Sequence, residues 1–159
     1  MLPCFCANLR RAARLVSRLY ENEPGWPSLS IAQFSLLQAI AQSGAIAHSG
    51  LGALLGLDQT TVSRSLATLG RLRWVRTAPG DDRRERRVAL TAAGKRQFEH
   101  AERAWRRAQA RFRRRYGANK WEQMQRALTV LAAAIPTMLS NSPGGSSAST
   151  KVSAARRGK

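Results

Sequence analysis

Acidic residues are scarce in this chain. It has 9 aspartates and glutamates against 27 lysines and arginines, so its formal net charge is +18. The imbalance is not a property of the C-terminus alone, because the rest of the chain keeps a charge of +14 without the four basic residues beyond position 140. This balance predicts a polyanionic partner.

Long apolar runs are also missing, and no stretch reaches the roughly 18 residues that a membrane span needs. The N-terminus has arginines within a helical pattern and lacks both the apolar core and the cleavage site of a secretory signal. We therefore expect a cytoplasmic protein with no membrane partner. With 43% hydrophobic residues in 159, the chain can form one domain, or a subunit that completes its core by pairing.

Signatures of catalysis are absent. Neither a G-x-S-x-G pattern nor a P-loop occurs, His48 and His100 are far apart, and the few carboxylates mostly lie beside arginines. We predict that the chain is not an enzyme and has no catalytic residue, no metal site and no cofactor. A small redox or metal-sensing enzyme is the weakest alternative.

Cysteine is limited to Cys4 and Cys6. On a regular helix their side chains would point about 200° apart, which disfavours both shared metal binding and a disulfide between them. An extended N-terminus would weaken these objections. The simplest interpretation is two buried small apolar side chains. Redox sensing is the first alternative, and metal or haem binding is the second.

Two short helices are predicted in the middle of the chain. Ser49 is expected to cap the first, which ends at Gly56, and Asp58 is expected to cap the second. In the second helix Val62, Leu66 and Leu69 form one apolar stripe. Its other face carries side chains suited to base edges in a DNA major groove, namely Gln59, Thr60, Thr61, Ser63 and Arg64.

A β-hairpin is predicted next, because residues 74–77 and 87–90 alternate in character and enclose a Pro-Gly-Asp-Asp turn. Residues 81–87 hold four arginines and three acids, so a carboxylate can fix a guanidinium in a bidentate pose. We assign this orienting role to Asp82 and DNA contacts to Arg83, Arg84 and Arg86. The alternative is a solvated turn with scattered ion pairs.

The first of the two helices offers a further contact at its start. Ser49 is predicted to bind DNA, because it or the neighbouring His48 can meet a phosphate. For His48 an ordinary surface histidine is an equal alternative.

These residues resemble the MarR family of bacterial transcriptional regulators. The wing signature Asp-x-Arg, a hydrophobic strand and Leu-Thr-x-x-Gly matches Asp82, Arg84, Val88, Leu90, Thr91 and Gly94. The recognition-helix pattern matches Asp58, Thr60, Thr61, Ser63 and Arg64. An upstream helix start matches Leu29, Ser30, Gln33, Phe34 and Leu37. The resemblance covers roughly residues 4–138.

Two positions depart from the family pattern. Gly52 stands where alanine is usual, which costs roughly 1 kcal/mol of helix stability. Arg73 stands where glycine is frequent before the first wing strand, and a non-glycine residue resists positive φ. Neither change touches the proposed DNA contacts.

Three further helices carry apolar seams at a/d spacing. The seams are Phe5, Leu9, Ala12, Val16 and Leu19; Phe98, Ala101, Trp105, Ala108 and Phe112; and Trp121, Met124, Leu128, Leu131, Ile135 and Met138. The resemblance implies that the helices bearing them build a homodimer, whereas packing within one chain is the alternative. Pro136 is expected to bend or end the last helix.

The predicted fold is therefore mainly α with a small β-hairpin wing, a winged helix-turn-helix dimerised through its N- and C-terminal helices. Residues 4–22 and 92–140 form the dimerisation region, residues 30–91 the DNA-binding region, and residues 141–159 a disordered basic tail. The seven arginines between residues 103 and 115 either attract DNA or only solvate the outer face of a helix.

The resemblance implies a homodimeric repressor that binds a pseudo-palindromic site on double-stranded DNA. Some members of the family bind small aromatic or phenolic effectors, and others sense oxidants through an N-terminal cysteine. The main alternative, favoured by the charge alone, is a sequence-tolerant architectural nucleic-acid-binding protein. The two differ in specificity, since a regulator prefers its operator over random DNA by about 10³-fold or more.

Overall fold

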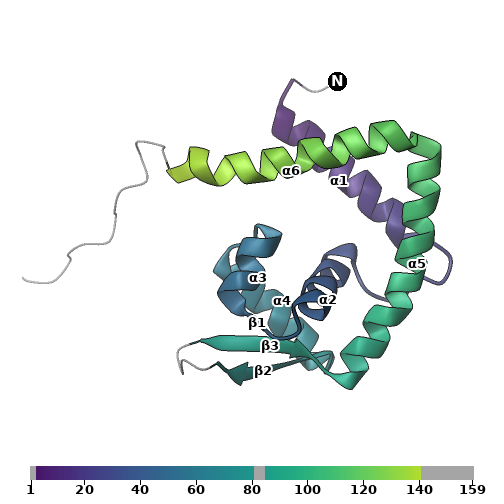
Figure 1. The fold of residues 1–159 in the computed structure, drawn as a ribbon. Coiled ribbons are helices and arrows are strands. Elements are labelled where there is room, and N and C mark those ends of the chain that lie inside the picture. The colour runs from purple at the N-terminus through teal and green to yellow at the C-terminus, as the bar shows by residue number, and fades with distance from the viewer. Residues whose placement is uncertain (1–2, 81–84, 141–159) are drawn as a thin grey trace, which may run out of the picture. The chain divides into compact units, whose positions relative to one another are not determined.

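The computed structural model describes residues 3–80 and 85–140 of the chain (Figure 1). These residues fall into two compact units, divided between residues 112 and 113. The elements are α1 (Phe5–Glu21), α2 (Ile31–Ser43), β1 (Ile46–Ala47), α3 (His48–Leu55), α4 (Gln59–Arg71), β2 (Val75–Pro79), β3 (Arg86–Leu90), α5 (Ala92–Tyr116) and α6 (Ala118–Ser140). The described chain is mostly helical with one small sheet, which confirms the predicted mainly α fold with a small β wing.

The sheet is antiparallel, with the strand order β1-β3-β2. Strands β2 and β3 form the predicted hairpin, in which Val75 lies opposite Leu90 and Pro79 opposite Arg86. The third strand, β1, pairs Ile46 with Val88 and was not predicted. A strand of two residues is too short to show an alternating pattern.

The main core lies among α2, α3, α4 and the sheet. Its largest fully buried side chains are Phe34, Leu37, Ile40, Leu51, Val62, Leu69 and Val88. Burial of each contributes about 1.5–3 kcal/mol. The predicted stripe of α4 is thus confirmed as the face that attaches this helix to the rest of the protein.

Helix α2 begins at a capping box. The Ser30 hydroxyl accepts a hydrogen bond from the Gln33 backbone N–H, and the Gln33 side chain accepts one from the Ser30 N–H. The pair satisfies two backbone donors that the first turn leaves unpaired. It fixes the start of the helix that carries Phe34 into the core.

The N-terminal part of α5 packs against this core. Phe34 lies 5.7 Å from Phe98 and 5.9 Å from Trp105, measured between ring centroids. Ala101, Ala104 and Ala108 are buried on the same helix. Over this stretch the predicted α5 seam is covered by its own chain. This agrees with the alternative of packing within one chain.

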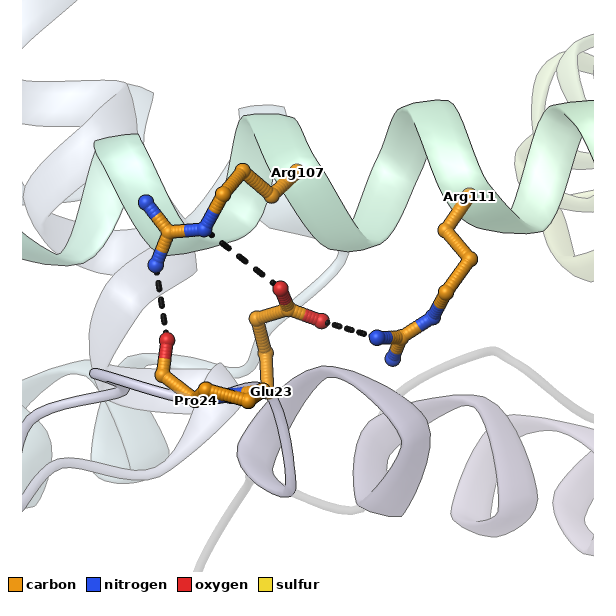
Figure 2. A network of polar contacts seen from close by, with 4 residues as sticks. All are labelled: Glu23, Pro24, Arg107 and Arg111. Carbon is orange, nitrogen blue, oxygen red and sulfur yellow. Dashed lines mark hydrogen bonds and ion pairs between the residues drawn. The ribbon is translucent and has the colours of Figure 1, made fainter.

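A buried carboxylate joins the loop after α1 to α5 (Figure 2). Glu23 is 7% exposed, and its Oε2 lies 2.7 Å from Nη1 of Arg111, in a geometry that makes an ion pair but not an aligned hydrogen bond. Arg107 places Nε 3.5 Å from Oε1 and donates to the Pro24 carbonyl at 2.7 Å. Nearby, the Tyr20 hydroxyl donates to the Gln109 side-chain carbonyl. Together these contacts hold α5 to the end of α1.

Helix α6 belongs to the second unit. It remains helical through Pro136 to Ser140, and an ion pair of 3.0 Å joins Arg113 to Glu122 at its start. Several of its large apolar side chains are exposed, namely Met124, Leu128, Val130, Ile135, Met138 and Leu139. Among the described helices none combines the length and the apolarity needed to cross a membrane.

Candidate nucleic-acid interface

Helices α3 and α4 meet at a tight turn. Gly56 ends α3 in the left-handed conformation with φ 64°, as its position predicted. A Cβ on Gly52 would lie 2.9 Å from the Leu57 carbonyl oxygen, so the departure from alanine here accompanies a very close approach of α3 to the turn. Gly52 therefore lowers the stability of the helix but permits this close packing.

The predicted cap of α3 is wrong. The helix begins at His48, its N-cap is Ala47, and no side chain caps it. Ser49 lies inside the first turn, because the pairing of β1 with β3 starts the helix earlier than the hydroxyl pattern suggested. The Ser49 side chain therefore does not cap the helix, and it is exposed.

The predicted cap of α4 is confirmed. Asp58 Oδ1 accepts from the Thr61 backbone N–H at 2.9 Å, and Oδ2 accepts from the Thr61 hydroxyl at 2.7 Å. The hydroxyl bond and then the backbone bond lower the pKa of Asp58, because both stabilise the carboxylate. The Thr61 hydroxyl is thereby engaged, which leaves its methyl group for an outside contact.

All five side chains proposed on the outer face of α4 are exposed, namely Gln59, Thr60, Thr61, Ser63 and Arg64. They lie outside the buried stripe and within the first two turns of the helix. The α4 backbone N–H groups at this end carry a partial positive charge that suits an anionic ligand. The face has the chemistry and exposure that contact with DNA requires.

A shallow hollow of about 250 Å³ lies between the start of α3, the start of α4 and the base of the wing. It is lined by His48, Ser49, Gln59, Glu85 and Arg86. Three of the predicted site residues, Ser49, Gln59 and Arg86, therefore share one surface although they are far apart in the sequence. Sequence reasoning did not anticipate Glu85 at this place.

The charged form of His48 at this hollow is disfavoured. Burial, and then the positive charge of Arg86, lower its pKa from the usual 6.5. Its Nε2 atom is shielded from solvent and has no hydrogen-bond partner within the described residues. Protonation would place an N–H at this buried position without an acceptor, which also disfavours the charged form of His48.

The base of the wing is tied down by an arginine that was not predicted. Arg87 donates from Nη2 to the Ala45 carbonyl at 2.8 Å, and its Nη1 lies 4.0 Å from Glu85. The Gly80 N–H donates to the Glu85 carbonyl at 2.8 Å. The proposed wing-tip contacts Arg83 and Arg84, and the orienting residue Asp82, lie outside the described residues.

The Leu-Thr-x-x-Gly motif joins the wing to α5. The Thr91 hydroxyl donates to the Arg73 carbonyl at 2.6 Å and accepts from the Gly94 N–H at 3.0 Å. A Cβ on Gly94 would lie 1.9 Å from the Trp74 carbonyl oxygen. The motif thus sets the position of the wing relative to α5.

Arg73 adopts a positive φ of 57°, the geometry that its departure from glycine called into question. Its N–H donates to the Gly70 carbonyl at 2.9 Å, and the Trp74 N–H donates to the Leu69 carbonyl at 3.0 Å. These two bonds form a Schellman motif, in which the left-handed residue terminates α4. The chain therefore keeps the turn at the cost of an unfavourable backbone conformation.

The expectation of buried cysteines is wrong. Cys4 and Cys6 are both exposed and unbonded. Cys4 is the extended N-cap residue of α1 and Cys6 lies in its first turn. The apolar seam of α1 starts at these residues and is uncovered at this end, with Phe5 67% and Leu9 39% exposed, which explains why the thiols are not buried. Within the described residues no group of three potential metal ligands gathers.

Comparison with known proteins agrees with this geometry. A model of the MarR family matches residues 28–85. The crystal structure of the M. tuberculosis transcriptional regulator MOSR in complex with DNA is 31% identical to this chain, with a TM-score of 0.74, and the match covers 85% of this chain and 98% of MOSR. The chain belongs to the MarR family. The members of this family are transcriptional regulators and not enzymes.

Two other matches are more distant in sequence. The regulator YwoH of Bacillus subtilis is 25% identical over 91 residues, which are 57% of this chain and 66% of YwoH. MarR from E. coli complexed with operator DNA is 20% identical, with a TM-score of 0.70 over 79% of this chain and 91% of MarR. At that identity the similarity concerns the winged-helix fold.

Proposed function

We propose that the protein is a homodimeric transcriptional repressor that acts in the cytoplasm and binds a pseudo-palindromic operator. The observation that carries the proposal is the exposed polar start of α4, anchored by its buried stripe and by the Asp58 cap. In this arrangement α4 enters the major groove and the wing follows the backbone or the minor groove. The two copies of α4 would read successive half-sites, about 34–36 Å apart.

Each outer residue of α4 has a partner that suits its chemistry. Gln59 pairs with adenine, Arg64 with guanine, and the Thr61 methyl contacts a thymine methyl. Thr60 and Ser63 donate to bases or phosphates. Ser49 and Arg86 bind phosphates at the hollow. Arg83 and Arg84 contact DNA at the wing tip, and Asp82 orients one of them.

The homodimer is proposed from the apolar side chains that α1 and α6 each expose. Phe5 and Leu9 on α1, and Leu128 and Met138 on α6, are each more than a third exposed. A monomer that exposed such seams would lose the free energy that their burial supplies. A second copy of the same chain carries the same apolar side chains and can cover them.

Release from DNA is proposed to follow a small aromatic or phenolic effector or an oxidant. Support for an effector comes from a structural neighbour, BpsR of Bordetella bronchiseptica, whose DNA binding is described as regulated by 6-hydroxynicotinic acid (19% identity, TM-score 0.71, covering 82% of this chain and 95% of BpsR). Support for an oxidant comes from the exposure of Cys4 and Cys6.

The decisive experiment selects bound fragments from the source genome and compares their affinity with random duplexes. A regulator prefers its selected site by about 10³-fold or more, whereas an architectural protein binds both alike. Arg64→Ala is expected to cost about 1–3 kcal/mol and to relax the preference at one base pair. Arg126→Ala, which removes an exposed arginine from α6, is the matched control and leaves the preference unchanged.

Light scattering tests the dimer. The unaltered chain is expected at twice its mass of 17.5 kDa, and Leu128→Asp shifts it toward the monomer because a buried unpaired carboxylate is costly. A monomeric unaltered chain at micromolar concentration would exclude the proposed arrangement.

A further inference from the structure

Most of the positive charge lies outside the winged-helix region. Helices α1 and α5 hold 13 basic and 3 acidic residues, whereas residues 30–91 hold 8 basic and 4 acidic residues. Neither α2 nor α3 contains a lysine or an arginine. Contact between the winged-helix region and DNA therefore leaves most of the cationic surface unexplained.

Four of the eight arginines of α5 are engaged in ion pairs within the chain. Arg107 and Arg111 hold the buried Glu23, Arg106 pairs with Glu102 at 3.0 Å, and Arg113 pairs with Glu122 at 3.0 Å. Their charge has a structural use, and part of it is neutralised by these partners.

Helix α1 differs in this respect. Arg10, Arg14 and Arg18 recur every fourth residue and, with the neighbouring Arg11, form what we name the α1 arginine face. All four side chains are exposed, and none forms an ion pair within the described parts of the chain. The single acid of the helix, Glu21, is occupied, because its carboxylate accepts from the Ile31 N–H at 2.8 Å.

Three of these arginines form a row along the axis of α1. At a rise of 1.5 Å per residue, successive arginines of the row Arg10, Arg14 and Arg18 are about 6 Å apart along the helix. By helical periodicity the row lies on the side of α1 opposite the apolar seam of Phe5, Leu9 and Val16. Pairing of two chains through that seam would leave the arginine face open to solvent.

We propose that the α1 arginine face binds the phosphate backbone of a nucleic-acid duplex, as a second contact that is independent of sequence and separate from α4 and the wing. Guanidinium groups bind phosphate oxygens in a bidentate manner, and a row of them matches a linear array of charges. The face has no aromatic side chain, so it offers no platform for stacked bases of a single strand. A protein that bound one duplex by α4 and another by α1 would join the two.

The experiment mixes the full chain with two short duplexes of random sequence, one carrying an energy-transfer donor and the other an acceptor. The unaltered protein is expected to bring them together and produce energy transfer. The variant Arg10→Gln, Arg14→Gln, Arg18→Gln is expected to lose that signal while it still binds a single duplex in an anisotropy titration. Its binding should also depend less on salt, with the slope of log K against log salt reduced by up to about 3.

Two matched variants separate position from charge. Replacement of the same three arginines by lysine preserves the charge and is expected to retain the energy transfer. The variant Arg115→Gln, Lys120→Gln, Arg126→Gln removes an equal charge from exposed positions elsewhere and is also expected to retain it. Circular dichroism of every variant checks that α1 and the rest of the chain remain folded.

Several outcomes would overturn the proposal. They are an unaltered protein that does not join the duplexes, an α1 variant that joins them equally well, and a control variant that loses the signal to the same extent. Capture of phosphatidylserine vesicles by the α1 face, without capture of the duplex, would assign it to a membrane surface instead. None of these outcomes bears on the proposed operator reading, which is judged by the effect of Arg64→Ala on sequence preference.

Discussion

Gly94 lies so close to Trp74 that a Cβ on the glycine would be 1.9 Å from the tryptophan carbonyl oxygen and 2.7 Å from its carbonyl carbon. Both atoms belong to backbone, which is further held by the Thr91 N–H donating to the same carbonyl at 3.0 Å. A flexible side chain could move aside, but this carbonyl cannot without disturbing the start of the wing. The last residue of the Leu-Thr-x-x-Gly motif is therefore a steric requirement of the junction.

Gly94→Ala is expected to destabilise the protein by about 3 kcal/mol or more, because overpacking here displaces backbone. Urea unfolding measures the loss. Gly70→Ala is the control, since Gly70 lies within α4 and a Cβ there would meet nothing within 4 Å. That change should stabilise the protein by about 0.5–1 kcal/mol. Equal effects of the two substitutions would refute the steric explanation.

Arg73→Gly is expected to stabilise the protein by up to about 1 kcal/mol. The left-handed conformation costs a non-glycine residue about 1–2 kcal/mol, and the greater freedom of glycine in the unfolded chain offsets part of the gain. Gly56→Ala should have the opposite sign, since Gly56 also has a positive φ, of 64°. Both are measured by denaturant midpoints, and a destabilised Arg73→Gly variant would contradict the assignment of strain.

Glu23→Gln is expected to cost about 1–3 kcal/mol, because it removes a buried charge that holds two arginines of α5 (Figure 2). Glu102→Gln is the matched control. Its partner Arg106 is 70% exposed, and an exposed pair four residues apart in a helix contributes about 0.3–0.5 kcal/mol. Chemical unfolding of both variants compares them, and a Glu23→Gln variant no less stable than Glu102→Gln would show that the network is dispensable.

His48 is expected to titrate below its usual pKa of 6.5, because burial and Arg86 both disfavour its charged form. The unfolded chain then binds more protons than the folded one, so this group lowers stability as the pH falls through 6.5 toward the folded pKa. Arg86→Gln should raise the pKa of His48 part of the way back. Proton NMR of the imidazole follows the titration, with His48→Gln to assign the signal, and an unshifted or raised pKa would contradict the geometry.

Cys4 and Cys6 are expected to act between subunits, if oxidation alters the protein at all, because both are exposed at the uncovered start of α1. Mild peroxide would oxidise one thiol from each subunit to a disulfide while the peroxide is reduced to two waters. Non-reducing electrophoresis should then show a crosslinked dimer, which the Cys4→Ser, Cys6→Ser variant cannot form. Operator affinity that is unchanged by peroxide in both proteins would leave the thiols without a regulatory role.

Local signals in the sequence were sufficient to predict helix α4. Asp58 was recognisable as a cap because a helix start depends on the hydrogen bonds of its own first turn. The positions of Val62, Leu66 and Leu69 identified the buried side, since helical periodicity alone decides which residues share a face. The exposed face followed from the same pattern.

Features that depend on distant residues could not be obtained in this way. Ser49 has the chemistry of a cap, but the pairing of Ile46 with Val88 starts α3 before it. The apolar pattern of α5 is equally consistent with packing within one chain and with packing between chains. The contacts of Phe34 with Phe98 and Trp105 show that this part of α5 packs within its own chain.

The sequence by itself determined where the helices lie, which side of α4 is buried and which residue types face outward, because those properties depend on neighbours within a few positions. Only the tertiary structure brought Ser49, Gln59 and Arg86 to one hollow and buried Glu23 beneath two arginines. It also showed that the arginines of α1 are without ion pairs in the described residues. The physical reason is that burial, charge pairing and backbone collision depend on which distant segments come within a few ångströms, and a one-dimensional pattern does not contain those distances.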